Sequence, residues 1–144
     1  MKITLNDTEI FASTGGREFD PSGKTLMFIH GSGQSHLGFM LQHRFFANRG
    51  WQCVTPDMPG HGLSSGKAFK TVEEMADWYA SFMQAVGIKK SSIIGHSMGG
   101  LIALELASRY SDLVSKAVFI STALAISVND TLIDMAANDE SKAI

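Results

Sequence analysis

The sequence predicts an α/β fold, a mostly parallel sheet with helices on both of its faces. Short apolar runs alternate along the chain with segments of helical period. The central runs are apolar throughout, which is typical of parallel strands buried on both faces. Three of them end in the turn-rich segments HGSGQS, DMPGHGLS and GHSMGG. Because ligands of such sheets bind at the carboxyl ends of the strands, one site is expected where these segments meet.

The N-terminal region is expected to form a β-hairpin. Its strands would be residues 2–14 and 16–20, on either side of a turn at Gly15–Gly16. Residues 25–30, TLMFIH, follow as the first buried strand. Residues 36–49 are expected to be helical, because a glycine suited to a helix C-cap comes directly after them.

A second unit of strand and helix comes next. Residues 51–55 form its strand, which a proline closes. Thr71 and Glu74 have the spacing of a capping box and therefore predict the first turn of a helix, which Gly87 ends. Between them, apolar side chains recur at helical period and mark the face that packs on the sheet.

The last predicted elements begin with a strand at residues 91–95. A helix rich in alanine and leucine follows at residues 98–110, and a further strand at residues 117–121. Beyond it the sequence predicts a loop and one more helix from about Asp130.

Composition and charge exclude several classes of function. The net charge is −2 in 144 residues and no basic stripe with interleaved aromatic side chains is present, so a nucleic-acid partner is not expected. No secretory signal opens the chain, and no apolar run approaches the ~20 residues of a membrane span. The single cysteine, Cys53, excludes an internal disulfide and favours a reducing, cytoplasmic location. No histidine pair has the spacing of a zinc helix, so no metal is expected.

Residues 95–99, GHSMG, form a G-x-S-x-G pattern between a predicted strand and a predicted helix. This context is the one in which the pattern forms a nucleophile elbow. The serine occupies a strained backbone conformation in a very tight turn, so its neighbours two residues away on either side must lack bulk. The hydroxyl of Ser97 would then stand clear of the sheet, beside the N–H groups of the following helix.

With these three segments the sequence resembles the N-terminal half of the alpha/beta-hydrolases. HGSGQS, DMPGHGLS and GHSMGG follow the third, fourth and fifth strands in that family's order and spacing. The resemblance implies that residues 1–124 are the N-terminal part of the hydrolase core, truncated after about the sixth strand. Residues 125–144 would be the start of a cap or lid segment.

The resemblance also implies roles for individual residues. Ser97 would be the nucleophile. The backbone N–H groups of Met98 and Ser32 would form the oxyanion hole, with Gly33 as the alternative second donor. This chemistry requires no cofactor. The residues expected to border the substrate pocket are Gly31, Gly33 and His96.

The family's catalytic acid and histidine follow the serine in the chain, but no histidine follows His96. We therefore expect both groups in sequence that these 144 residues do not contain. The predicted strand at residues 117–121 would form an uncovered sheet edge, through which the chain could self-associate. The acidic residues after that strand are interpreted as surface groups: Asp130, Asp134, Asp139 and Glu140.

The remaining polar residues near the site have structural interpretations. His96 could be a base, but in this turn the residue before the serine points away from the hydroxyl. His30 and His61 are expected to hold their loops by hydrogen bonds to the backbone. His43 is expected on the surface, and Asp57 in a structural position of its loop.

Three hypotheses for function remain open at this point. The first is a serine hydrolase that acts by acyl transfer on an ester, thioester or lactone, or on an activated C–C bond, of a small-molecule substrate. The second is a catalytically inactive fragment, or a binding module that a partner completes. The third is a lyase or perhydrolase that uses the same serine and oxyanion donors.

Overall fold

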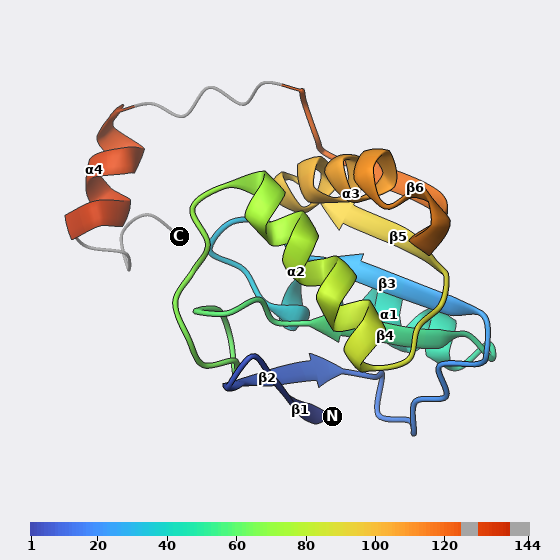
Figure 1. Cartoon of the computed structure of the whole chain (residues 1–144). Coiled ribbons are helices and arrows are strands. Elements are labelled where there is room, and N and C mark those ends of the chain that lie inside the picture. The colour runs from blue at the N-terminus through green and yellow to red at the C-terminus, as the bar shows by residue number, and fades with distance from the viewer. Residues whose placement is uncertain (125–129, 139–144) are drawn as a thin grey trace.

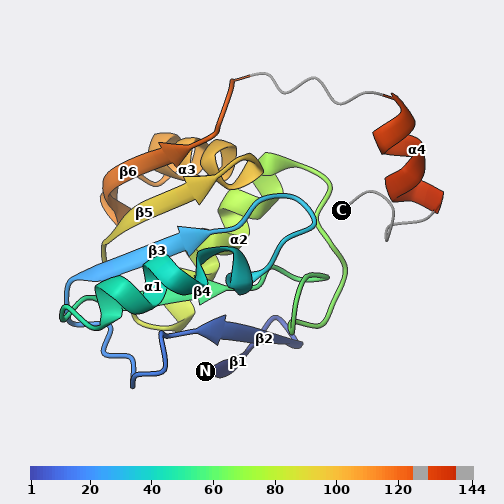
Figure 2. The same cartoon turned by 180° about the vertical axis from the view of Figure 1, so that it is seen from behind.

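The computed structural model describes residues 1–124 and 130–138. Within these residues six strands form one sheet in the order β1-β2-β4-β3-β5-β6 (Figures 1 and 2). The strands are β1 (Lys2–Leu5), β2 (Thr8–Ser13), β3 (Thr25–Ile29), β4 (Gln52–Pro56), β5 (Ser91–His96) and β6 (Val114–Ile120).

The sheet is mostly parallel, as predicted. β4, β3, β5 and β6 run parallel, whereas β1 and β2 are antiparallel additions at one edge. Strand β3 pairs with β5 from Thr25↔Ser91 to Ile29↔Gly95, so the segments after both strands leave the sheet together. Because β4, β3 and β5 are parallel, the three turn-rich segments that follow them lie at the same end of the sheet. β6 begins at Val114, earlier than the predicted start at Ala117.

Helices cover both faces of the sheet, which confirms the predicted class. On one face lies α1 (Met40–Ala47), preceded by the short 3₁₀ helix η1 (His36–Phe39) (Figure 2). On the other lie α2 (Val72–Ala85) and α3 (Met98–Arg109) (Figure 1). The remaining described helices are η2 (Ser111–Leu113) and α4 (Asp130–Asn138).

Two apolar clusters fill the space between the sheet and these helices. Met27 and Ile29 of β3 belong to the cluster under α2 and α3, whereas Phe28 belongs to the cluster under α1. This alternation is the period-two pattern of a strand buried on both faces. Cys53 lies in the α1 cluster, where burial raises the pKa of its thiol to about 11. It is a core side chain, not a reactive thiol.

The helix start predicted at Thr71 is confirmed. Thr71 is the N-cap of α2. Its hydroxyl accepts a hydrogen bond from the Glu74 N–H, and the Glu74 carboxylate accepts one from the Thr71 N–H. Two N–H groups without partners in the first turn are thereby satisfied. This helix presents Tyr79 and Phe82, both fully buried, to the sheet.

The predicted hairpin turn at Gly15–Gly16 is wrong. The hairpin joins β1 to β2 through Asn6 and Asp7, whose φ angles are 49° and 57°. Two positive φ angles suit the twist of a two-residue hairpin loop, and Asn and Asp tolerate them. Gly15 is needed elsewhere, because a Cβ on it would lie 2.7 Å from the Cβ of Ala47 in α1.

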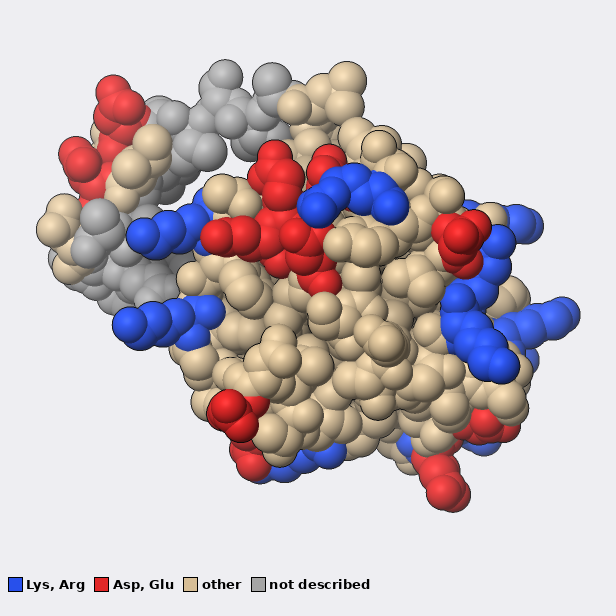
Figure 3. Space-filling model, viewed as in Figure 1, with Lys and Arg blue, Asp and Glu red and all other residues tan. Residues whose placement is uncertain are grey.

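The surface of the α2–α3 side carries mixed charge. Among the described residues on this face, acidic and basic side chains lie beside one another over the helix layer, with uncharged surface between such groups (Figure 3). One contact of this kind joins the Arg109 guanidinium to the Asp77 carboxylate at 2.7 Å. None of the described helices has the length and apolar character needed to cross a bilayer.

Candidate active site

The turn between β5 and α3 has the geometry predicted for the nucleophile. Ser97 has φ 53° and ψ −120°, a conformation that L-residues rarely adopt. A Cβ on Gly95 would collide with the Gly99 carbonyl oxygen and lie 2.6 Å from the Gly100 nitrogen. The turn is therefore so tight that only glycine fits two residues before the serine.

Hydrogen bonds from a later part of the chain hold this turn. The Ser97 N–H donates to the Ile120 carbonyl at 2.9 Å. The Thr122 hydroxyl donates to the Ser97 carbonyl at 3.1 Å. The N–H and the carbonyl of Ser97 are thus fixed to the last residue of β6 and to the segment directly after it, whereas its side chain has no such bond to a described residue.

The segment after β3 lies next to this elbow. Residues 31–34 form a β-turn in which the Gln34 N–H donates to the Gly31 carbonyl at 3.3 Å. Gly33 has φ 64°, which is typical of the third position of a type II turn. Among the described residues, neither the Ser32 N–H nor the Met98 N–H donates to a protein acceptor. These are the two N–H groups predicted for the oxyanion hole.

His30 joins this segment to the one after β4. Its Nε2 accepts a hydrogen bond from the Met58 N–H at 3.2 Å, so its proton is on Nδ1, which donates to the Gly31 carbonyl at 2.9 Å. Burial lowers the pKa of this imidazole and keeps it neutral. His61 similarly bonds the Pro59 carbonyl at 3.1 Å. Both histidines hold loops, as expected.

Asp57 organises the loop after β4. Its carboxylate is fully buried and accepts hydrogen bonds from the backbone N–H groups of His36, at 2.6 Å, and Leu63, at 2.9 Å. The His36 Nδ1 lies 2.9 Å from the same carboxylate. With all these partners, Asp57 acts as a structural acid, which agrees with the expectation.

The expectation for His43 is wrong. It lies on the inner face of α1, 1% exposed, with Nδ1 at 3.1 Å from the Thr55 hydroxyl. Burial lowers the pKa of its imidazole to about 4. Helical period alone did not predict this orientation, because a histidine is compatible with either face. The close packing of Gly15 on its ring is a contact that only the fold reveals.

Residues 24–141 match the model of a family described as alpha/beta hydrolase fold. The chain belongs to the alpha/beta hydrolase family. Over 98 residues it is 37% identical to the dihydrolipoyllysine-residue acetyltransferase component of the acetoin cleaving system of Cupriavidus necator, covering 67% of this chain and 25% of that protein. Over 99 residues it is 36% identical to human protein ABHD8, covering 67% of this chain and 23% of that protein.

Solved structures of the family agree with the fold. A membrane phospholipase A, described as a bacterial virulence factor, superposes with a TM-score of 0.78 at 30% identity, over 90% of this chain and 41% of that chain. The enol-lactonase of Burkholderia xenovorans LB400 gives 0.82 at 20% identity, over 99% of this chain and 55% of that one. The chain thus spans about a quarter of its curated relatives and about half of these solved chains.

The described residues around Ser97 offer few partners for its hydroxyl. No hydrogen bond joins the Ser97 hydroxyl to another described side chain, and they contain no group of acids, histidines and cysteines that could hold a metal ion. Asp130 and Asp134 are exposed, and Asp139 and Glu140 lie outside the described residues. The arrangement can present a serine hydroxyl beside two free N–H donors.

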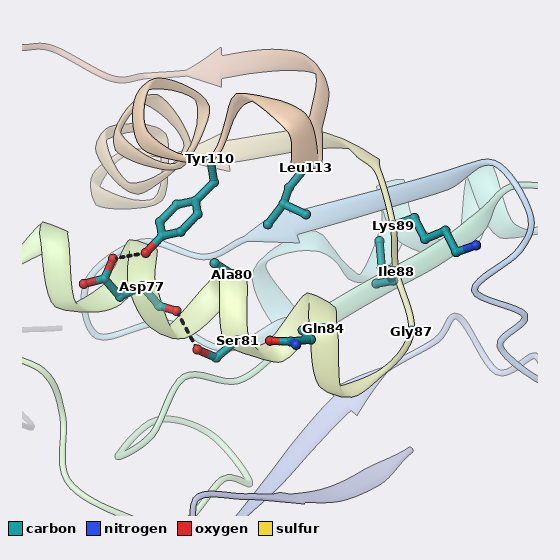
Figure 4. Close-up of a pocket in the computed structure, with 9 residues that line it drawn as sticks. All are labelled: Asp77, Ala80, Ser81, Gln84, Gly87, Ile88, Lys89, Tyr110 and Leu113. Atoms are coloured by element: carbon teal, nitrogen blue, oxygen red, sulfur yellow. Dashed lines mark hydrogen bonds between the residues drawn. The ribbon is translucent and has the colours of Figure 1, made fainter.

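A pocket of about 520 Å³ lies beside α2 and the segments that precede β5 and β6 (Figure 4). Ala80 and Gln84 of α2, Lys89 before β5 and Leu113 before β6 line it, so it lies at the amino ends of the strands, whereas the site is at their carboxyl ends. At its edge the Tyr110 hydroxyl donates to the Asp77 carboxylate at 2.5 Å, a bond that raises the pKa of the tyrosine. No motif in the sequence indicated this pocket.

Proposed function

We propose that this chain carries the nucleophile and the oxyanion donors of a serine hydrolase. The observation that supports this most directly is the positive φ of Ser97 in a glycine-confined turn between β5 and α3. Strain of this kind persists only where surrounding structure enforces it, and it is typical of functional sites. The free N–H groups of Ser32 and Met98 supply the second element of the chemistry.

The reaction proposed is acyl transfer. The Ser97 oxygen attacks the carbonyl carbon of the substrate while a base takes the hydroxyl proton. The negative charge that develops on the carbonyl oxygen accepts hydrogen bonds from the Ser32 and Met98 N–H groups. Loss of the alcohol or thiol, protonated by the same base, leaves an acyl-serine that water hydrolyses. We propose that the base, a histidine, and its acid come from outside the described residues.

The substrate class proposed is an ester, thioester or lactone. A phospholipase A, an enol-lactonase, carboxylesterases and a thioesterase domain are among the structures with this fold. We also propose a cytoplasmic location, since the one cysteine of the sequence is a free, buried thiol.

The alternative is a binding module without catalysis. It is favoured by the absence, among the described residues, of any histidine hydrogen-bonded to the Ser97 hydroxyl. Such a module would keep the elbow and the oxyanion donors and would bind acyl compounds without turning them over.

The deciding experiment is labelling of the folded 144-residue chain with a fluorophosphonate, with and without added imidazole. Imidazole replaces the base that the described site lacks. We expect slow labelling of one residue, faster with imidazole, abolished in Ser97→Ala and retained in the control Ser108→Ala, a change of an exposed serine in α3. Intact mass and peptide mapping locate the adduct. A folded chain that stays unlabelled even with imidazole would support the binding module.

A further inference from the structure

The side chain of Gln34 connects the two parts of the proposed oxyanion hole. Its Oε1 accepts a hydrogen bond from the Gly31 N–H at 3.1 Å, within the segment after β3. The same oxygen lies 3.3 Å from Nδ1 of His96, the residue directly before the nucleophile. One carbonyl oxygen therefore has partners in both loops, which are distant in sequence.

The space on the Gly31 side of this oxygen is narrow, although the Gln34 side chain as a whole is exposed. A Cβ on Gly31 would lie 3.1 Å from the Gln34 Oε1 and 3.3 Å from the His96 carbonyl oxygen, so a side chain there would displace these atoms by a few tenths of an ångström. The His96 ring also packs edge-on against Phe39, with centroids 6.5 Å apart. The ring is thus held from two sides and directed toward Gln34.

Two chemical consequences follow from these contacts. Because the amide oxygen of Gln34 can only accept, His96 must donate from Nδ1 and therefore carries a proton there. Because the Gly31 N–H is already occupied, it cannot bind an oxyanion. The next N–H groups in the turn, those of Ser32 and Gly33, donate to no described acceptor and are left as donors opposite the elbow, and Ser32 is the first of them.

We infer that Gln34 is a positioning residue that sets the distance between the Ser32 and Met98 N–H donors and holds His96 with its proton on Nδ1. Its effect on reactivity rests on the proposed function, whereas its effect on the two hydrogen bonds does not. A carbonyl oxygen at this place is the requirement, so glutamate can replace glutamine and an apolar side chain of similar length cannot.

The first test observes the hydrogen bonds themselves. Nitrogen NMR of the His96 ring at neutral pH is expected to show the proton on Nδ1 in the wild-type chain and in Gln34→Glu. In Gln34→Met the Nδ1–H loses its acceptor, so the proton shifts mainly to Nε2 and the Gly31 amide proton exchanges faster with solvent. Gln84→Met, the same change at a glutamine in the distant pocket, serves as the control.

The second test measures reactivity. The rate of imidazole-assisted fluorophosphonate labelling of Ser97 is expected to fall by about 10- to 100-fold in Gln34→Met, because small displacements of an oxyanion donor have effects of this size. The labelling rates of Gln34→Glu and Gln84→Met are expected to stay within about threefold of the wild-type rate.

The outcomes separate this inference from the proposed function. An unchanged His96 ring and Gly31 amide in folded Gln34→Met would overturn it entirely. Changed hydrogen bonds with an unchanged labelling rate would overturn the positioning role. If wild-type Ser97 is not labelled at all, the proposed function fails, and the NMR comparison still decides whether Gln34 makes both contacts.

Discussion

At the scale of single residues, backbone strain in this chain is concentrated at two places. Among the described residues the non-glycine positions with positive φ are Asn6 and Asp7 in the hairpin, and Ser97 and Ser121 beside the site. The first pair occurs where a tight hairpin demands it. Ser97 and Ser121 do not lie in a hairpin loop, and the positive φ of each costs about 1–3 kcal/mol of conformational free energy. The packing of β5, β6 and α3 has to offset that cost.

His43 predicts a dependence of stability on pH. The folded pKa of this histidine is about 4, against an ordinary value of 6.5, because it is buried. Below pH 6.5 the unfolded chain binds a proton that the folded chain refuses, so the free energy of unfolding falls as the pH drops toward 4. The expected loss is about 3 kcal/mol across this window.

Urea unfolding of the wild type and of His43→Gln, followed from about pH 7 to about pH 4.5, measures this contribution. His43→Gln should be less stable at neutral pH but should lose less stability on acidification. Parallel pH profiles of the two proteins would show that His43 is not the group responsible.

Some of these residues could be predicted from the sequence and others could not. The tight turn at Ser97 and the free N–H groups of Met98 and Ser32 could be predicted, because they depend on short segments whose order along the chain is informative. His43 and Gln34 could not, because their role depends on which residues the fold brings against them. A buried imidazole and a bridging amide leave no periodic signal in the sequence.

At the scale of elements, the close approach of α3 to the sheet is the feature that shapes the elbow. A Cβ on Gly99 would collide with the Ile29 carbonyl oxygen and lie 2.7 Å from that of His30. Both are backbone atoms at the end of β3 and cannot move aside cheaply. The start of α3 is thus held directly against β3, the strand that leads into the turn at residues 31–34.

We therefore predict that Gly99→Ala destabilises the chain by about 1–3 kcal/mol, as overpacking in a core does. The matched control is Gly38→Ala, where the new methyl group would meet the Gln34 side chain at an ordinary 3.5 Å. It is expected to change stability by less than about 1 kcal/mol. Urea unfolding measures both, and equal values for the two variants would contradict the argument.

The elements also show why the sequence predicted most of the fold but misplaced the hairpin. Buried strands and the capped helix α2 carry strong local signals. The pair Gly15–Gly16 carries an equally strong turn signal, but it serves the path of the chain past α1 rather than a hairpin. The weaker pair Asn6–Asp7 makes the hairpin turn, so the two turn signals could not be ranked without the tertiary contacts.

At the scale of the whole molecule, β6 is an open sheet edge. No described strand pairs with its outer side, and Val118, Phe119 and Ile120 are 49%, 47% and 39% exposed. The Ile120 carbonyl accepts from the Ser97 N–H on the inner side. Because backbone groups alternate along a strand, those of Ala117 and Phe119 point outward and are open to a further strand.

We predict that the 144-residue chain self-associates through this edge, with two copies of β6 paired antiparallel. Sedimentation over a wide range of protein concentration should show dimers or larger species. Val118→Lys, which places a charge on the edge, should shift the distribution toward monomer. The control is Leu41→Lys, at an exposed leucine of α1 far from the edge. A wild-type chain that stays monomeric throughout would exclude this surface as an interface.

The bonds that hold the elbow also have a consequence for the order in which the chain is made. Ser97 is fixed by Ile120 and Thr122, which a ribosome adds later and which emerge from the exit tunnel after the serine. During synthesis the serine is therefore present before the groups that enforce its strained conformation. The nascent chain can form β3, β4 and their loops first, and Ser97 reaches its final geometry only when β6 has paired with β5.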